Sequence, residues 1–199
     1  VGAKTRNAGA TSVIPPNMIL EIKGAPTKVI NAKGTSIRFI IIDTTPLIKR
    51  YHNNHKYPDI DEQNYEQQME WLNSVLSNAK EDWVIVAGHH PIHAHTDKSR
   101  SERVDMRNSV DKTLRQHKNV SIYICGHIHN FQHLRDKNSH IDYIVNSSAA
   151  KSRSVDDTKR TVYCSPETGF SVISANENVL TLYMIDKNGN ILHSVNKRK

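Results

Sequence analysis

The chain has 199 residues, of which 37% are hydrophobic and 24% charged, and its formal net charge is +7. This length suits one domain with a sizeable core, and no apolar run reaches the roughly 18 residues of a membrane span, so we expect no membrane partner. Basic residues are scattered and aromatic residues make up only 6%. We therefore expect no nucleic-acid partner, whereas a basic surface favours anionic substrates.

The first two thirds of the chain alternate between predicted strands and helices. Residues 1–27 contain three prolines and no clear hydrophobic period, so we expect an irregular segment there. The run IRFIII over residues 37–42 predicts a buried strand. A helix with one apolar face follows, capped by Asp59 or Asp61 and ending near Asn78. Strands are also predicted over 83–87 and 120–125, with a helix over about 103–117 between them. This order indicates an α/β layered domain.

The remaining third of the chain is rich in predicted strands. Strands are expected over residues 141–145, 170–174, 179–185 and 191–195. Asn188-Gly189 separates the last two strands, and this dipeptide is typical of a tight hairpin turn. We therefore expect the chain to end in a β-hairpin. Its two cysteines, Cys125 and Cys164, are too few for a disulfide framework, and Cys125 is expected to be a buried, small apolar residue.

Histidines gather after two of the predicted strands. Gly88-His89 follows the first and Gly126-His127-Ile128-His129 the second, and eight of the 12 histidines lie between His89 and His133. Ligands of open α/β sheets bind outside the carboxyl ends of strands, so this clustering predicts a site. On extended backbone, His127 and His129 would point the same way and reach two neighbouring metal ions. Any one of these histidines could instead be an ordinary hydrogen-bonded residue at a strand end.

These stretches resemble a known family. GHHP and GHIH, within WVIVAGHHPI and YICGHIHNFQHL, are similar to the last two of the five metal-binding motifs of calcineurin-like metallophosphoesterases, above all the purple or tartrate-resistant acid phosphatases. The resemblance covers residues 28–199, whereas residues 1–27 match nothing in the family. It implies the C-terminal half of a layered αββα sandwich. It also implies that His89 and His127 bind the second of two metal ions (Fe, Zn or Mn) and His129 the first.

The carboxylate-bearing motifs of the family have no counterpart in this chain. No GD dipeptide occurs, and the only GN, Gly189-Asn190, lies in the predicted hairpin. The resemblance therefore implies that a missing N-terminal segment or a partner chain supplies the carboxylate ligands. For the 199 residues alone we expect little or no turnover.

The resemblance implies hydrolysis of small phosphate monoesters. A histidine of the loop after GHHP would protonate the leaving alkoxide, and we favour His95 over His93. His90 is expected to form part of the pocket wall, and Asp43 to cap a turn, since the family's Asp-Thr at this position is not a ligand. Other expectations concern a pocket rim or simple turn at Asn146-Ser147-Ser148 and two solvated loop histidines, His52 and His55.

Three interpretations stay open at this stage. The chain belongs to an acid-phosphatase-like metallohydrolase, or it is a non-catalytic remnant with a weak histidine metal site, or it is a subunit whose carboxylates arrive on another chain. The resemblance also implies a secreted or periplasmic protein, although the first thirty residues lack the apolar core of a signal peptide.

Overall fold

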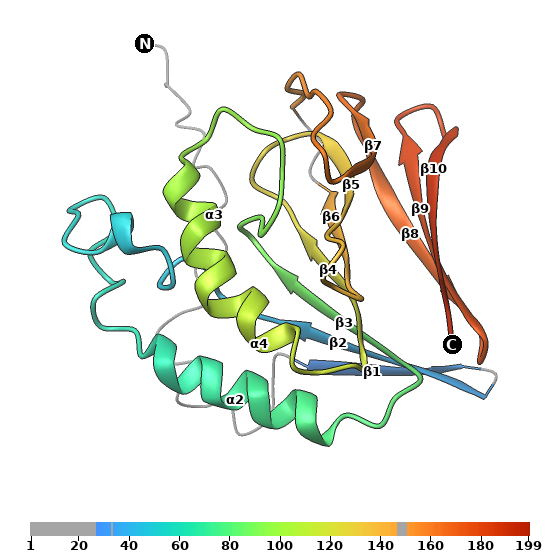
Figure 1. Ribbon diagram of the computed structural model, residues 1–199, viewed down its shortest axis with the longest axis horizontal. Helices are drawn as coiled ribbons and strands as arrows, with labels where there is room; N and C mark the ends of the chain where they lie inside the picture. Colours follow the sequence, from blue (N-terminus) through green and yellow to red (C-terminus); the bar gives the residue numbers. More distant parts are fainter. Residues whose placement is uncertain (1–26, 33, 147–150) are drawn as a thin grey trace, which may run out of the picture.

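The computed structural model describes residues 27–32, 34–146 and 151–199, which form two β-sheets and a layer of helices (Figure 1). The larger sheet has the strand order β1-β2-β3-β4-β6-β5-β7. Its strands are β1 (Thr27–Ala32), β2 (Thr35–Ile41), β3 (Trp83–Gly88), β4 (Val120–Cys125), β5 (Phe131–Arg135), β6 (Asp142–Asn146) and β7 (Thr161–Ser165). The smaller, antiparallel sheet consists of β8 (Gly169–Ala175), β9 (Val179–Asp186) and β10 (Ile191–Arg198).

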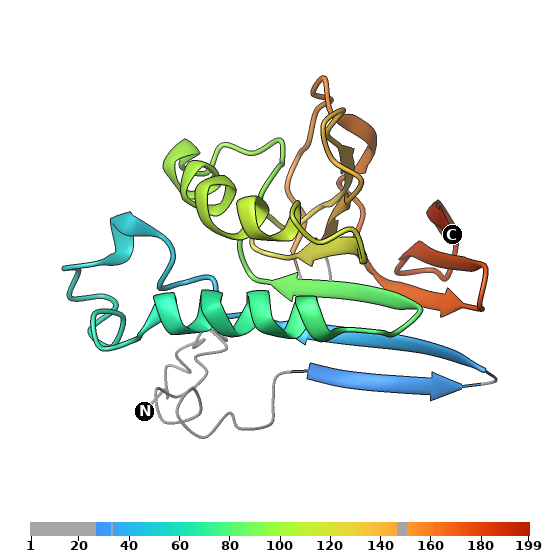
Figure 2. The same cartoon turned by 60° about the horizontal axis from the view of Figure 1, so that its bottom comes forward.

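The helices lie on one face of the larger sheet (Figure 2). They are η1 (Lys49–Tyr51), α2 (Tyr65–Asn78), α3 (Arg100–Met106), the π-helical turn η2 (Arg107–Asp111) and α4 (Lys112–Leu114). Helix α2 buries Leu72 and Leu76 in one core cluster, and the α3–α4 helix adds Met106 and Leu114 to the same cluster. Burial of these apolar side chains, rather than helix propensity, stabilises such short helices.

Strand alternation explains the layers. In β3, Val84 and Val86 belong to the core cluster under the helices, whereas Trp83 and Ile85 belong to a second cluster with the smaller sheet. Successive side chains of a strand point to opposite faces, so a continuously apolar strand is expected to be covered on both. From the smaller sheet, β9 contributes Leu180, Leu182 and Met184 to the second cluster, all with 0% exposure.

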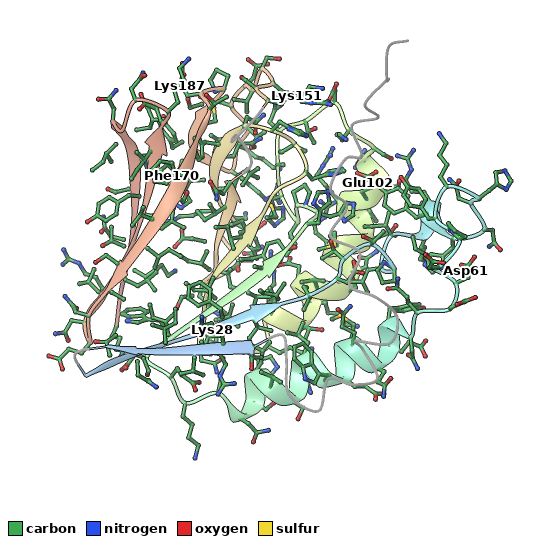
Figure 3. All side chains as sticks on the ribbon, turned by 180° about the vertical axis from the view of Figure 1, so that it is seen from behind. Lys28, Asp61, Glu102, Lys151, Phe170 and Lys187 are labelled. Carbon is green, nitrogen blue, oxygen red and sulfur yellow. The ribbon has the colours of Figure 1, made fainter. Side chains whose placement is uncertain are left out.

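The outer face of the smaller sheet carries no helix among the described residues. Phe170 and Val172 of β8 are 52% and 43% exposed there (Figure 3). The described part of the chain is thus a three-layer arrangement of helices, a mixed sheet and an antiparallel sheet. The second helix layer of the expected αββα sandwich does not occur within it.

Most predicted elements are confirmed, and the differences are local. The hairpin at the end of the chain is present, and the helix expected over 103–117 begins earlier, at Arg100, and ends at Leu114. The helix that ends at Asn78 begins only at Tyr65, because the side chain of Asn64, rather than Asp59 or Asp61, caps it by accepting from Gln67 N. Strands β1, β5 and β7 were not predicted. The segment 1–27 falls outside the described residues except for Thr27, which begins β1, and Ser147 and Ser148 also fall outside them.

Sheet topology gathers several strand ends at one edge. Strands β2, β3, β4 and β6 run parallel, so the residues after Ile41, Gly88 and Cys125 emerge on the same side. Strand β5 is antiparallel to β6 and starts at this edge, where Phe131 pairs with Asn146. The loops that carry His89 and His127 therefore meet, as the sequence predicts.

Candidate metal site

Three histidines form a compact group at this edge. Ligand atoms of His89, His90 and His127 all lie within 4.8 Å of one another, and no carboxylate belongs to this described group. The rings of His89 and His127 cross nearly edge to face with centroids 4.9 Å apart. His89 Nε2 lies 3.0 Å from His127 Nδ1. Two nitrogens bound to one tetrahedral ion at about 2.0–2.1 Å would be roughly 3.3 Å apart, so this pair fits a shared metal ion.

The backbone of the second histidine loop is strained rather than extended. His127 and His129 have φ angles of 74° and 59°, in the left-handed region that non-glycine residues rarely adopt. The loop turns back so tightly that Ile128 N donates to Gly126 O at 2.9 Å. Our prediction that the GHIH segment is extended is therefore wrong. Strain of this kind concentrates at functional sites.

Gly88 permits close packing under the first histidine. A Cβ at this position would lie 2.7 Å from both Thr44 Cγ2 and the Tyr123 hydroxyl. That hydroxyl donates a 2.8 Å hydrogen bond to the carbonyl of His90. The glycine thus lets β3 and its neighbours approach closely enough to fix the loop that begins at His89.

A buried carboxylate supports His127 from the side away from His89. Glu102 of α3 is only 4% exposed, and its Oε2 accepts from His127 Nε2 at 3.2 Å. Its Oε1 accepts from the Tyr51 hydroxyl at 2.9 Å and from Arg50 at 3.3 Å. Because a carboxylate can only accept, the Nε2 proton stays on His127 and leaves the Nδ1 lone pair toward His89. Carboxylate–histidine pairs of this kind orient metal-ligating imidazoles.

His90 is held by protein groups on both ring nitrogens. Its Nδ1 lies 2.8 Å from Thr44 Oγ1, and its Nε2 lies 3.3 Å from the Tyr51 hydroxyl. Burial, followed by the charges of His127 and His89, lowers the pKa of His90 to about 2. Both nitrogens are engaged in the wall of the site, so this histidine has less freedom to bind an ion than His89 and His127.

Electrostatics keep the histidine pair neutral. Burial, and after it the charge of Lys98, lowers the pKa of His127 to about 4. The same two causes, in the same order, lower the pKa of His89. A neutral imidazole is the form that binds metal ions, so the donor chemistry of this pair fits an N-ligated ion such as zinc or iron.

The remaining predicted site residues lie in different surroundings. His129 is outside the compact group, and burial followed by Arg153 and Lys151 lowers its pKa. His95 is half-buried, and its backbone exchanges two 2.8 Å hydrogen bonds with the fully buried Gln132 side chain. His93 is 5% exposed, packs edge to face on Tyr143 and has a buried Nε2 with no hydrogen-bond partner among the described residues.

The minor expectations have mixed outcomes. Asp43 Oδ1 accepts from Thr45 N at 2.8 Å, which confirms its turn-capping role. His55 is exposed, as predicted, but His52 is half-buried and bonds both Asp61 and the carbonyl of Pro46. Asn146 accepts from the Ser171 hydroxyl at 3.1 Å. Cys125 is buried, as predicted, and neither cysteine forms a disulfide.

Three residues of the site escaped the sequence analysis: Tyr51, Glu102 and Gln132. Glu102 lies in helix α3 and Gln132 in strand β5. Polar side chains are usually exposed, so the sequence alone suggests that both face solvent. A buried polar residue that pairs with a ligand histidine has no characteristic spacing, so only the fold brings these residues to the site.

Comparison with known proteins agrees with the geometry. The family model for calcineurin-like phosphoesterases matches residues 14–131. The tartrate-resistant acid phosphatase type 5 of Rattus norvegicus is 37% identical over 81 residues, which cover 41% of this chain and 24% of the relative. Purple acid phosphatase 3 of Arabidopsis thaliana is 25% identical over 185 residues, covering 83% of this chain and 47% of the relative.

Solved structures share the fold. The protein described as GAP50, the anchor in the inner membrane complex of Plasmodium, superposes with a TM-score of 0.68 at 23% identity over 86% of this chain and 53% of that one. A dimetal phosphatase from Danio rerio gives a TM-score of 0.55 at 16% identity over 81% and 57% of the two chains. The chain thus spans about half, or less, of the length of these relatives. None of its described helices has the length and apolar character to cross a bilayer.

Proposed function

This chain belongs to the calcineurin-like phosphoesterase family, and we propose that, together with a carboxylate-bearing segment, it hydrolyses small phosphate monoesters as acid phosphatases do. The observation that carries the proposal is the His89–His127 pair, with ring nitrogens 3.0 Å apart and a buried Glu102 behind it. An arrangement with two converging neutral imidazoles and a carboxylate support has the chemistry of a metal site.

The proposed ligands divide between two ions. His89 and His127 would hold one ion and His129 the other, with Fe, Zn or Mn as candidates. When bound, two metal ions supply a hydroxide nucleophile near neutral pH and neutralise charge on the phosphoryl oxygens. Glu102 keeps the proton of His127 on Nε2 and so presents Nδ1 for binding.

His95 is the proposed proton donor to the leaving alkoxide. Its Nδ1 accepts from Asp156 N at 3.1 Å, so Nε2 is the ring nitrogen left to exchange a proton with the substrate. The two hydrogen bonds to Gln132 fix the backbone of His95. His93 is the weaker candidate, because it is buried against Tyr143 and 3.9 Å from Asp136.

A pocket beside His89 is the proposed place for the carboxylate ligands that this chain lacks. A pocket of about 510 Å³ opens beside His89 and is lined by apolar side chains such as Ile41 together with Asp43. Ile41, the last residue of β2, is 49% exposed, although the preceding Ile40 is fully buried. We propose that the segment that completes the αββα sandwich packs against this face and brings its carboxylates to His89. Either a segment that precedes these residues or a partner chain would supply it.

A second candidate function follows from the donor set itself. The compact group consists of histidines without a carboxylate, and a bridging ligand is what couples two metal ions in a hydrolytic site. If no carboxylates are supplied, the chain would be a non-catalytic scaffold with one weakly held ion. Export from the cell, as a secreted or periplasmic protein, remains a proposal from the family resemblance.

The test compares the full-length protein with its His127→Ala variant. We expect about two metal ions per wild-type molecule by elemental mass spectrometry, metal-dependent hydrolysis of p-nitrophenyl phosphate, and loss of about one ion and most activity in the variant. His55→Ala, at an exposed loop position, serves as the matched control and should change neither quantity. One ion or none in the wild type, with no hydrolysis, would support the scaffold instead.

A further inference from the structure

A chain of polar side chains joins the two sheets at a place that the proposed reaction does not use. His193 of β10 places its Nε2 2.9 Å from Nδ1 of His133 on β5. The other ring nitrogen of His133 lies 2.7 Å from Oδ1 of Asp142 on β6. His133 and Asp142 are each 1% exposed, whereas His193 is half-buried. The smaller sheet is thus attached to the larger one by buried hydrogen bonds as well as by apolar packing.

The carboxylate sets the position of every proton along this chain. Burial raises the pKa of Asp142, but hydrogen bonds from His133, Arg135 and Lys197 outweigh burial and hold that pKa below its usual range. An ionised carboxylate only accepts, so His133 donates from Nε2 and accepts at Nδ1. His193 must then donate from Nε2, which leaves the lone pair of the neutral ring on Nδ1. That atom is where His193 takes up a proton.

The groups that face His193 do not favour a positive charge on it. Arg135 on β5 lies 2.5 Å from Asp142, and Lys197 on β10 lies 2.9 Å from the same carboxylate. Asp142 is the one carboxylate that contacts this cluster within the described ranges, and it already serves two cations. On β7, Tyr163 stacks against the His193 ring with centroids 4.5 Å apart, and an aromatic face attracts a cation only weakly.

These surroundings make attachment of the smaller sheet sensitive to acid. Burial, followed by the charges of His133 and Arg135, lowers the pKa of His193 to about 4. If β10 separates and the ring enters water, its pKa returns to about 6.5. Between these values the separated form binds more protons than the attached form. Acid therefore shifts the equilibrium toward separation.

We propose that His193, His133 and Asp142 form an inter-sheet latch, which holds the smaller sheet against the larger one at neutral pH and releases it when His193 is protonated. Release would expose the apolar residues between the sheets. Trp83 is one of them, and its indole N–H donates to the carbonyl of Asn176, between β8 and β9, at 2.8 Å. The helix layer packs on the opposite face of the larger sheet and should stay in place. The latch does not depend on the proposed phosphatase function.

The test is backbone hydrogen exchange of the whole protein, followed by mass spectrometry at pH 7 and pH 5. Rates are corrected for the intrinsic effect of pH on exchange. Protection of peptides from β9 and β10 should fall about tenfold at pH 5, because the separated form gains the proton first. Peptides from α2, in the core cluster under the helices, should change less than threefold. Equal falls in α2 and β10 would mean global acid unfolding and would overturn the latch, and so would unchanged protection of β10.

Variants identify the titrating group. His193→Gln keeps an amide donor for His133 but cannot be protonated in this range, so its β10 protection should change less than threefold between the two pH values. His55→Gln, at an exposed position, and His93→Gln, in the other core, should both keep the tenfold fall. A tenfold fall in His193→Gln would assign the acid effect to another group and overturn the latch.

The wild type gives a check that needs no substitution. An NMR titration of the His193 imidazole should give a pKa well below the ordinary 6.5 of a solvated histidine. An ordinary value would show that protonation costs nothing in the attached form, which contradicts the latch even if His193→Gln does not fold.

Discussion

At the residue scale, the contact between Glu102 and His127 makes the metal site testable without removing a ligand. Glu102→Gln keeps the size of the side chain but loses the charge that holds the His127 proton on Nε2. Removal of such carboxylate partners typically costs 10–100-fold in metal affinity. We therefore expect the dissociation constant for Zn²⁺, measured by competition with a chromophoric chelator, to rise by about that factor.

Asp105→Asn is the matched control for this change. Asp105 lies on the same helix and accepts from Lys49 N at 3.0 Å, but no described contact joins it to a histidine. The zinc affinity of Asp105→Asn should stay within about twofold of the wild type, because this carboxylate contacts no histidine among the described residues. Equal affinities in Glu102→Gln and Asp105→Asn would show that Glu102 does not orient the ligand.

Also at the residue scale, buried His93 should make the stability of the folded chain depend on pH. Burial, followed by the charge of Arg160, lowers its pKa to about 4, whereas in the unfolded chain it is near 6.5. Between these values the unfolded state binds more protons, so the free energy of unfolding falls as pH decreases from about 6.5 to 4. The full shift corresponds to roughly 3 kcal/mol.

Replacing His93 should weaken the dependence of the free energy of unfolding on pH. In His93→Gln, urea unfolding at a series of pH values should show a smaller decrease in stability between pH 6.5 and 4 than the wild type does. The pKa of Asp136 is lowered to about 2, so its contribution to the free energy of unfolding is lost only below pH 4, outside this window. An unchanged slope in the variant would mean that His93 is protonated without cost in the folded chain.

At this scale the sequence located the histidine pair of the candidate site but not the residues that support it. Strand-end position and the GH pairs were enough to bring His89 and His127 together, because parallel strands fix where their ends emerge. The backbone after Gly126 could not be foreseen, since His127 itself takes the left-handed conformation that glycine usually supplies. Glu102 sits on a helix face that sequence pattern assigns to solvent.

At the element scale, the strands with clean hydrophobic patterns were predictable and the others were not. Strand β5 buries Gln132 and His133 as well as Phe131 and Leu134, because polar partners from neighbouring segments satisfy the two polar side chains. Its sequence therefore shows neither alternation nor a continuous apolar run. Strand β1 lies at the sheet edge, where its exposed side chains are under little pressure to be apolar.

In strand β9, buried and half-buried side chains alternate, and the buried ones should contribute most to stability. Leu182 is 0% exposed and faces the larger sheet, whereas Thr181 points to the opposite, half-buried face. Leu182→Ala removes buried methyl groups and leaves a cavity, which typically costs 2–5 kcal/mol. We expect the free energy of unfolding, from urea denaturation, to fall by about that amount in Leu182→Ala and by less than about 1 kcal/mol in Thr181→Ala. Equal losses would place the core on the other face of β9.

At the scale of the whole molecule, the layers follow from which faces are covered. The helices cover one face of the larger sheet completely enough to bury Ile40 and Val84, while the smaller sheet covers only part of the other. Ile41 and Phe170 remain about half exposed, at 49% and 52%. The sequence could indicate that carboxylate motifs are absent, but only the structure reveals which apolar faces are left uncovered.

Metal binding should stabilise the whole chain through the same histidine pair. A ligand at 100 times its dissociation constant, bound only to the folded state, adds about 2.7 kcal/mol, which for a chain of this size corresponds to a rise in Tm of roughly 5–10 °C. We expect Zn²⁺ to raise the Tm of the wild type by this amount in calorimetric scans, because His89 Nε2 and His127 Nδ1 already lie 3.0 Å apart. His127→Ala should lose the increase, whereas His55→Ala should keep it. A rise of the same size in His127→Ala would assign the stabilising ion to other residues, and the proposed ligand pair would then be wrong.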